Sequence, residues 1–523
     1  MEFSRRQFLG TTVAAGAAAV LAGRARAQGT AKYTRYNATS PQGGAMLESY
    51  AVAIGKMLAL PPTDARNWFR NALIHTLDCP HGNWWFFPWH RGYLGWFERT
   101  IRELSGNANF AMPYWDWTQL RQIPDQMFNG VLTPTDAAYN PYISSYQTFF
   151  DYVNPPLTAF WDKRTPDQGK QLDLRGYKTL DAVWTQIKNN PMYATTPSAR
   201  YLTRQDPALD CSTSAMCASA IIRTGLWPTT FIPFSSEKTP SHNSSPSSAT
   251  QWGVLEGLPH NNVHNNIGGI NHVQPPDYGY MQDNLSPVDP VFFLHHSNMD
   301  RLWDVWTRKQ QKLGLPTLPT GPDLATWQRE LFLFFINPQG NPVTANTAGD
   351  YATIGDFDYT YQPGSGEAVI AEATGAAAAA AKAKFSGKVQ GSAGSVSVGS
   401  ALLNQAAASG TMVAKVTLPH PSGSTAPRNF DVLVNAPPGI SSVSPDSPYY
   451  AGTIAFFGAM PGMAMNVTFH VPLTKALVGL RAAKLLGANE LRISIVPHAP
   501  VQAGPRLMAT PPAQLRGVSV EVW

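Results

Sequence analysis

The sequence carries little net charge, few cysteines and no apolar run long enough to cross a membrane. Its formal net charge is +5 over 523 residues, and residues 1–27 hold four arginines and one glutamate, which leaves about +2 for the rest. So small a charge argues against a nucleic-acid partner, because phosphate recognition needs a basic surface. The apolar run at 11–23 has about 13 residues, short of the ~20 that a membrane span requires, so we expect no membrane span.

The first 27 residues have the features of an export signal. Residues 4–9 read SRRQFL, a twin-arginine pattern, and Ala25-Arg26-Ala27 is a small-residue cleavage site. We therefore predict a Tat signal peptide at 1–27, the Tat export machinery as a partner, and a periplasmic or secreted protein. The chain that remains is too long for one hydrophobic core, which predicts two or three domains.

Three histidines lie close together in an otherwise apolar stretch. His75, His81 and His90 fall within sixteen residues that are rich in tryptophan, phenylalanine and proline. A buried neutral imidazole loses its hydrogen bonds to water unless its ring nitrogens find a partner. A transition metal is the partner that satisfies several imidazoles at once, so this stretch predicts a metal site.

A second set of histidines completes the pattern. His260 and His264 are four residues apart, so they project from the same face of a helical turn, and His296 follows later in the chain. His295 points to a different helix face and is expected to support the site rather than bind metal. Two sets of three imidazoles predict two metal ions, and all-imidazole sites suit copper, zinc, iron or nickel. Spacing alone does not choose among these metals.

Both histidine segments resemble the copper signatures of the tyrosinase family, and the resemblance extends over about residues 40–340. The positions that match are His81, Phe86, Phe87, Trp89, His90, Arg91, Leu94 and Glu98 in the first signature, and Asp289, Pro290, Phe292, Phe293, His296 and Asp300 in the second. The resemblance implies a dicopper centre with dioxygen as co-substrate. In that centre CuA is held by His75, His81 and His90, and CuB by His260, His264 and His296.

Helical periodicity predicts a mainly α catalytic domain at 28–363, in which a four-helix bundle with long loops holds the dicopper centre. Residues 118–257 are expected to be irregular, with 235–250 as a mobile surface loop near the entrance. The predicted helices are 44–60, 64–77 with Asp64 as a candidate N-cap, one beginning after Pro88, one near Leu258 that carries His260 and His264, and 296–312.

The three cysteines lead to two predictions. Cys211 and Cys217 are close in sequence, and in an exported protein such a pair can form a local disulfide. Cys79 lies two residues before His81. This spacing resembles the Cys-x-His of fungal and plant family members, in which the sulfur is joined to a ring carbon of the second CuA histidine. The resemblance implies a thioether between Cys79 and His81, with a reduced buried thiol as the alternative.

Access and proton handling separate the functions that such a centre supports. A monophenol with a pKa near 10 must lose its proton before hydroxylation, which requires a base. Glu256 and Asn261 match the pair that in tyrosinases is thought to polarise a water for this step, and they favour a tyrosinase acting on small phenolic substrates. A catechol oxidase with diphenolase activity only is the alternative, and a dioxygen carrier is a third reading that the export signal disfavours. The sequence leaves open whether the chain forms a homo-oligomer.

After residue 363 the composition and the hydrophobic periodicity of the sequence change. Residues 364–387 are rich in alanine and glycine and predict a linker. Residues 388–523 contain seven runs of alternating apolar and polar residues, which predict a small all-β sandwich. The runs are SVSVG, MVAKVTLP, FDVLVNAP, GTIAFFG, MNVTFHVPL, LRISIVP and VSVEVW.

The β region resembles, more loosely, the C-terminal domain of plant polyphenol oxidases, which covers the copper entrance and keeps the enzyme latent. One loop of this region carries aromatic and thioether side chains. We predict that it plugs the metal pocket, with ordinary sandwich packing as the alternative. The candidate plug residues are Phe456, Phe457, Met460 and Met463.

Overall fold

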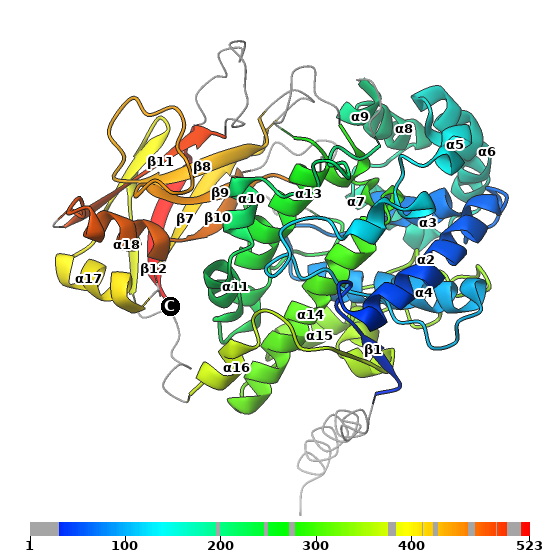
Figure 1. The fold of residues 1–523 in the computed structure, drawn as a ribbon, viewed down its shortest axis with the longest axis horizontal. Coiled ribbons are helices and arrows are strands. Elements are labelled where there is room, and N and C mark those ends of the chain that lie inside the picture. Colours follow the sequence, from blue (N-terminus) through cyan, green and yellow to red (C-terminus); the bar gives the residue numbers. More distant parts are fainter. Residues whose placement is uncertain are drawn as a thin grey trace, which may run out of the picture.

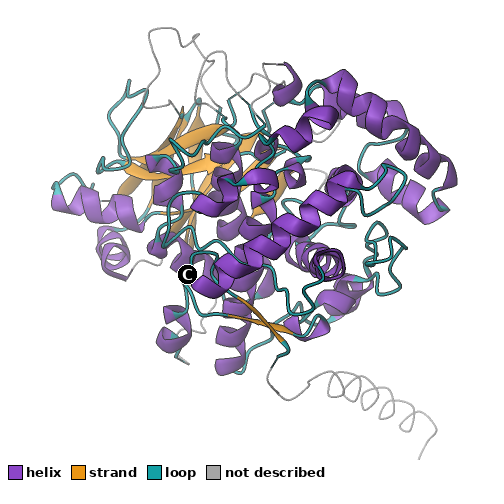
Figure 2. Ribbon diagram, turned by 45° about the vertical axis from the view of Figure 1, so that its right-hand side comes forward, coloured by secondary structure: helices purple, strands orange, loops and turns teal. Residues whose placement is uncertain are grey.

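The computed structural model describes residues 31–194, 199–244, 249–270, 278–374, 383–409, 412–421, 427–458, 466–487, 489–498 and 514–523. The predicted signal at 1–27 therefore lies outside the described residues. A helical body and a β-rich C-terminal region lie side by side (Figures 1 and 2), which confirms the predicted fold class. No helix among the described residues is both long and apolar enough to cross a membrane.

The helical segments that carry predicted ligands are α3 (Trp68–Asp78), α4 (Phe86–Ser105), the π-helical turn η4 (Glu256–His260) that continues into α13 (Asn261–Ile267), and α14 (Val291–Lys312). Helix α2 (Pro41–Ala59) carries no histidine and packs against α3 and α4. The five predicted helices are thus confirmed, apart from the N-cap of α3. Asn67 caps α3 by accepting from the backbone amides of Phe69 and Arg70, whereas Asp64 pairs with Arg66 in the preceding turn.

The region 118–257, expected to be irregular, contains eight α-helices among its described residues. Its sequence folds into short helices joined by turns, and proline is tolerated at the first positions of several of them because the amide it lacks would be unpaired there anyway. These helices are α5 (Asn140–Ile143), α6 (Tyr146–Lys163), α7 (Pro166–Leu174), α8 (Leu180–Lys188), α9 (Pro191–Ala194), α10 (Cys211–Met216), α11 (Ser219–Leu226) and α12 (Phe231–Phe234).

Two five-stranded sheets make up the β-rich region and share one hydrophobic core. One sheet has the order β2-β10-β7-β12-β4, and the other has the order β5-β6-β11-β8-β9. All seven predicted runs are strands, and helices α17 (Ser400–Ser409) and α18 (Thr474–Ala482) accompany them. The strands are β4 (Ala383–Ser386), β5 (Lys388–Gln390), β6 (Ala393–Ser397), β7 (Met412–Pro419), β8 (Asn429–Val434), β9 (Tyr450–Ala455), β10 (Asn466–Pro472), β11 (Glu490–Pro497) and β12 (Gly517–Val522).

One edge strand of this region comes from the helical body. Strand β2 (Ala249–Trp252) precedes η4 directly and pairs in parallel with β10, from Asn466 opposite Ala249 to Phe469 opposite Trp252. The edge of the C-terminal sheet is therefore covered by a segment that also positions the second histidine set. Such pairing ties the two regions through backbone hydrogen bonds.

Parts of the predicted linker at 364–387 have regular structure. Helix α16 (Ala368–Glu372) contacts α14, where Arg308 pairs with Glu367, and β4 belongs to the C-terminal sheet. Residues 375–382 lie outside the described residues. The rest of the helical body comprises α15 (Pro322–Arg329) and the parallel pair β1 (Tyr33–Arg35) and β3 (Tyr359–Tyr361).

A buried ion cluster joins the first and second signature helices. Asp300 of α14 accepts from Arg91 Nε of α4 at 2.7 Å and from Arg35 of β1 at 3.1 Å, and the hydroxyls of Tyr359 and Tyr361 on β3 donate to it as well. Burial opposes ionisation, but Arg91 and Arg35 lower the pKa of Asp300. Removing one partner from such a cluster leaves buried charge without compensation.

We expect Asp300→Asn to lower the free energy of unfolding by about 3–5 kcal/mol, because Arg91 then loses its carboxylate partner inside the protein. Urea unfolding followed by tryptophan fluorescence measures this loss. Asp125→Asn is the matched control: its partner Arg204 is exposed, so it should cost less than about 1 kcal/mol. Equal losses for the two variants would contradict the role of the cluster.

Candidate metal centre

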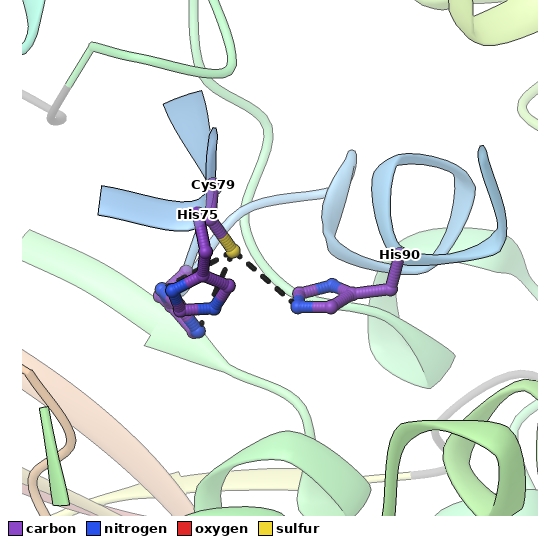
Figure 3. Close-up of side chains that lie close together, drawn as sticks. His75, Cys79 and His90 are labelled. Atoms are coloured by element: carbon purple, nitrogen blue, oxygen red, sulfur yellow. Dashed lines mark hydrogen bonds between the residues drawn. The ribbon is translucent and has the colours of Figure 1, made fainter. Parts of the chain in front are cut away.

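The first histidine set converges at the ends of α3 and α4. His75 lies on α3, His81 on the loop that follows it, and His90 on α4. Together with Cys79 these side chains form a group whose candidate ligand atoms all lie within 4.8 Å of one another. Figure 3 shows the sulfur of Cys79 pointing toward the imidazole of His90.

Backbone carbonyls fix the protonation of two of these rings. His75 Nδ1 lies 2.7 Å from the carbonyl oxygen of Asn284, and His90 Nδ1 lies 2.7 Å from that of Phe86. A carbonyl oxygen only accepts, so Nδ1 carries the proton in each ring. The Nε2 lone pair is thereby left for a metal ion, and the carbonyl orients the ring.

The second set converges in the same way on α13 and α14. His260, His264, His295 and His296 form a second group of candidate ligand atoms within 4.8 Å of one another. His260 Nδ1 faces Asn261 Oδ1 at 2.8 Å, and His264 Nδ1 faces the carbonyl oxygen of Met281 at 2.6 Å. His260 and His264 therefore also present an Nε2 lone pair.

His295 differs from its neighbours in its tautomer. Its Nδ1 accepts a hydrogen bond from the indole of Trp117 at 3.1 Å, so the proton of the neutral ring is on Nε2. A protonated Nε2 has no lone pair to give to a metal. His295 thus lies within the second group, although the sequence predicts that it points to a different helix face, and this tautomer leaves no Nε2 lone pair for a metal.

The two groups face each other in the interior of the helical body. The rings of His90 and His296 are stacked, with centroids 4.1 Å apart, and those of His81 and His260 are 5.8 Å apart. Phe292 separates His75 from His296, with ring centroids 5.1 Å and 4.2 Å away, respectively. The structure therefore brings all six predicted ligands to one place.

The burial of these rings fits a pair of cations. Desolvation by burial lowers the pKa of His75 and of His260 to about 3, so both stay neutral. His75 Nε2 and His260 Nε2 are buried and have no hydrogen-bond partner among the described residues. A buried lone pair without a donor is costly unless a metal ion takes it. The donor set of neutral imidazoles thus fits two transition-metal ions.

Cys79 is placed for a bond to His81. Its Sγ lies 3.8 Å from both ring nitrogens of His81 and 3.3 Å from His90 Nε2. Desolvation by burial raises the pKa of the Cys79 thiol well above its ordinary value. Cys79 is a free thiol in this structure, and the thioether that the family resemblance implies stays a prediction.

The predicted disulfide between Cys211 and Cys217 is wrong for this structure. The two residues lie at opposite ends of α10, Cys211 exposed and Cys217 buried, and both are free thiols. A rise of 1.5 Å per residue separates them by about 9 Å along the helix, beyond the reach of a disulfide. The helix that keeps them apart begins at Asp210, which caps the amide of Thr213.

Glu256 and Asn261 lie beside the two groups, and neither polar end is free in this conformation. Glu256 accepts from the amide of Gly82 at 2.6 Å and from the Ser236 hydroxyl. Burial raises the pKa of Glu256 to about 8 in spite of these hydrogen bonds. Asn261 holds His260 through Oδ1 and donates from Nδ2 to the carbonyl oxygen of Ala455 at 2.7 Å. Glu256 thus anchors the His81 loop, and Asn261 links the second group to β9.

The ring of Phe457 covers both groups. Its centroid lies 4.2 Å from that of His264, 4.7 Å from that of His81 and 5.6 Å from that of His260. Phe456 points the other way, into the β core against Phe430 and Phe469, so it is not a plug residue. Met460 and Met463 lie outside the described residues.

A buried polar cluster next to the first group was missed in the sequence. His242 Nε2 lies 2.9 Å from Asp78 and its Nδ1 lies 2.6 Å from Glu330. Burial by itself lowers the pKa of His242, but the two carboxylates raise it to about 9. Asp78 also accepts from the indole of Trp89, whose ring lies beside those of His75 and His90. The imidazolium therefore neutralises carboxylates that hold the first group in place.

The segment that carries His242 had been expected to be a mobile surface loop. Instead, Ser235, Ser236, Thr239 and Ser241 are buried, as are His242 and Asn243. The hydroxyl-rich composition that suggested exposure is explained by internal hydrogen bonds, such as the one from Ser241 to Glu330. The only signal in the sequence was a histidine within a polar stretch.

The central part of the helical body matches a known protein family. Residues 58–309 match the family model described as the common central domain of tyrosinase. A latent polyphenol oxidase of Prunus armeniaca is 25% identical over 287 residues, 51% of this chain and 40% of that protein. A tyrosinase of Hahella sp. (strain CCB-MM4) is 28% identical over 289 residues, 54% of this chain and 47% of that protein. These matches span less than half the length of both relatives.

Solved structures resemble the chain over nearly its whole length. Latent aurone synthase, a polyphenol oxidase, superposes with a TM-score of 0.57 at 19% identity, covering 95% of this chain and 90% of that one. Latent apple tyrosinase superposes with a TM-score of 0.52 at 20% identity, covering 95% and 98%. At these identities the likeness establishes the fold, including the β-rich C-terminal region.

We expect His242→Gln to destabilise the protein below pH 6.5 by on the order of 3 kcal/mol, because the raised pKa of His242 contributes stability there. This contribution should be lost as the pH rises through about 9. Urea unfolding curves of both proteins from pH 6 to pH 10 measure it. Asp431 also raises the pKa of His498 against the effect of burial. Because His498 is present in both proteins, its contribution cancels in the difference between their free energies of unfolding. A difference in the free energy of unfolding that stays constant from pH 6 to pH 10 would contradict this assignment.

Proposed function

Because the chain belongs to the tyrosinase and polyphenol oxidase family, we propose that it is a tyrosinase that the C-terminal region keeps latent. It hydroxylates monophenols to o-diphenols and oxidises o-diphenols to o-quinones, with dioxygen as co-substrate. The observation that carries this proposal is the convergence of two groups of neutral imidazoles, each with a buried Nε2 that has no hydrogen-bond partner among the described residues, in His75 and in His260. Oxygen carriers share that centre, but the twin-arginine signal favours an exported enzyme.

Each histidine group would hold one copper ion. CuA would be held by His75, His81 and His90, and CuB by His260, His264 and His296. Copper is chosen over zinc because the family implies it and the reaction needs a redox metal. When bound, the copper pair supplies the redox chemistry by which dioxygen is reduced and the phenol oxidised.

The chain's own residues orient the ligands and exclude water. The carbonyls of Asn284, Phe86 and Met281 hold Nδ1 protons and so direct Nε2 of three rings inward. A thioether between Cys79 and His81 would fix the one ligand that lies on a loop. Phe292 packs against His75 of the first group and His296 of the second, so an apolar ring borders both groups, and such a border excludes water and strengthens electrostatic interactions.

Glu256 and Asn261 support monophenol hydroxylation as well as diphenol oxidation. A carboxylate and an amide beside the centre are groups that polarise a water, and such a water takes the phenol proton. Catechol oxidase remains the second candidate function. It is favoured by the hydrogen bonds that Glu256 makes with Gly82 and Asn261 makes with Ala455, because these bonds compete with a water for the two side chains.

Latency rests on Phe457 and on three asparagines of α13. Phe457 lies where a phenol ring would stack on His264. Asn261, Asn262 and Asn265 donate to the carbonyl oxygens of Ala455, Thr453 and Phe456, respectively, at 2.7–2.9 Å. The C-terminal region therefore blocks the phenol site and also occupies the amide of Asn261. The domain limits at 28–363 and 388–523 and Tat export stay predictions.

We expect two copper ions per chain in the copper-loaded protein, and quinone formation after a lag when a monophenol is supplied without diphenol. His90→Gln and His296→Gln should each lower the copper count and abolish oxidation, because each removes a ligand. Metal analysis and absorbance at the quinone band measure both. His470→Gln, a histidine that bonds the carbonyl of Trp252 away from the centre, should keep both ions.

Fewer than two copper ions in the unchanged chain would overturn the dicopper assignment. Two ions with product from catechol alone would replace tyrosinase by catechol oxidase. Both outcomes are read from the same preparations.

We expect Phe457→Gly to raise catechol oxidation several-fold, because it empties the space over His264 and His81. Monophenol hydroxylation should rise less, since Asn261 stays bonded to Ala455. Initial rates with catechol and with 4-methylphenol measure the two effects. Phe456→Leu alters the neighbouring ring that faces the β core and should leave both rates unchanged. An unchanged catechol rate in Phe457→Gly would remove the plug.

A further inference from the structure

An apolar cavity lies behind helix α3, on the side away from the histidine groups. Its volume is about 210 Å³. Arg70, Leu73, Ile74 and Leu77 line one wall, and their spacing along α3 places them on one face of the helix. His75 projects from the opposite face, so the helix separates the cavity from the first histidine group.

The other walls come from elements far apart in sequence. Leu157 and Phe160 of α6 face the cavity, and Phe334 and Phe335 from the segment after α15 close it. Leu157 and Phe335 are each 1% exposed, so these walls belong to the core. A comparable apolar cavity of about 150 Å³ holds one benzene ring. The volume here accepts one ring with a small substituent.

Arg70 is the charged residue among the lining side chains. Its guanidinium donates to the carbonyl of Pro62 at 3.3 Å, and no carboxylate among the described residues pairs with it. The nearby carboxylate of Asp64 is already taken, because Arg66 bonds both of its oxygens. Desolvation by burial lowers the pKa of Arg70, with no acidic group to oppose it. A half-buried guanidinium with free donors favours an anion.

We propose that this cavity is a binding site for an aromatic monocarboxylate, with the ring among the apolar walls and the carboxylate on Arg70. A guanidinium presents two parallel donors that match a carboxylate. The apolar walls supply the affinity for the ring, and Arg70 selects the acid over its neutral amide. The site is distinct from the histidine groups and does not depend on the proposed oxidation.

Two successive aromatic contacts connect the wall of the cavity to the first histidine group. Phe335, which lines the cavity, lies 5.3 Å from Trp89, and Trp89 lies 5.8 Å from His75, as measured between ring centroids. A ligand that fills the cavity therefore packs against residues that support a proposed copper ligand.

The test is a titration of the copper-loaded, full-length protein with 4-fluorobenzoate, followed by fluorine NMR. We expect saturable binding of one equivalent, at least tenfold weaker in Arg70→Met and for 4-fluorobenzamide. Arg329→Met removes an exposed arginine outside the cavity and should bind as the unchanged chain does. Leu157→Trp fills the cavity without changing charge and should abolish binding. Thermal melts of each variant identify any that fails to fold.

Benzoates also bind metal centres, and the variants separate the two sites. Binding that survives both Arg70→Met and Leu157→Trp at unchanged affinity would overturn the proposal and assign the ligand to the metal centre. The absence of saturable binding would overturn it as well, and the cavity would then be a packing defect. Either result leaves the copper count and the phenol assay unaffected, so failure of this proposal is distinguishable from failure of the proposed function.

Discussion

The rest of the structure depends on bringing six neutral imidazoles together, five of them buried. Four of these rings, those of His75, His90, His260 and His264, have Nδ1 bound by an acceptor, which leaves the lone pair of Nε2 for a metal. Rings with aligned lone pairs repel and are stripped of water, which is unfavourable until cations occupy the space between them. Backbone carbonyls make this arrangement possible, because those of Asn284, Phe86 and Met281 hold the Nδ1 protons of three rings. The carbonyl of Phe86 belongs to α4, and those of Met281 and Asn284 belong to the segment before α14. This segment therefore matters to the site although it carries no ligand.

Two buried charge clusters hold the helices in that arrangement. Asp300 joins α14 to α4 and β1 through Arg91 and Arg35, so the two signature helices cannot move independently. His242 neutralises Asp78 and Glu330 at the end of α3. Both clusters lie outside the ligand sets, yet each fixes an element that carries ligands. The C-terminal region adds a third constraint, since β2 pairs with β10 immediately before η4.

Patterns of local origin could be predicted from the sequence. The spacing of histidines and the two signatures specify all six candidate ligands, because ligand geometry on a helix follows from residue spacing. Short apolar runs separated by Gly, Pro, Ser or Asn predict all seven C-terminal strands. Strands β7 and β11 alternate between buried and partly exposed residues, whereas β8 and β9 are buried at every position. The predicted N-cap of α3, Asp64, is wrong, although Asp and Asn are both good capping residues. The choice of Asn67 over Asp64 depends on Arg66, which bonds both carboxylate oxygens of Asp64.

Contacts between distant segments were decided only by the tertiary structure. Phe456 and Phe457 are adjacent and chemically identical, and both come after the end of β9. The path of this segment in the folded chain turns the first ring into the β core and the second onto the histidines. The polar segment around His242 is buried because Asp78 and Glu330, 164 and 88 residues away, meet it there. The composition and periodicity of a segment indicate whether its side chains can be buried. Only the folded chain determines which partner meets it, because the partners come from remote parts of the sequence.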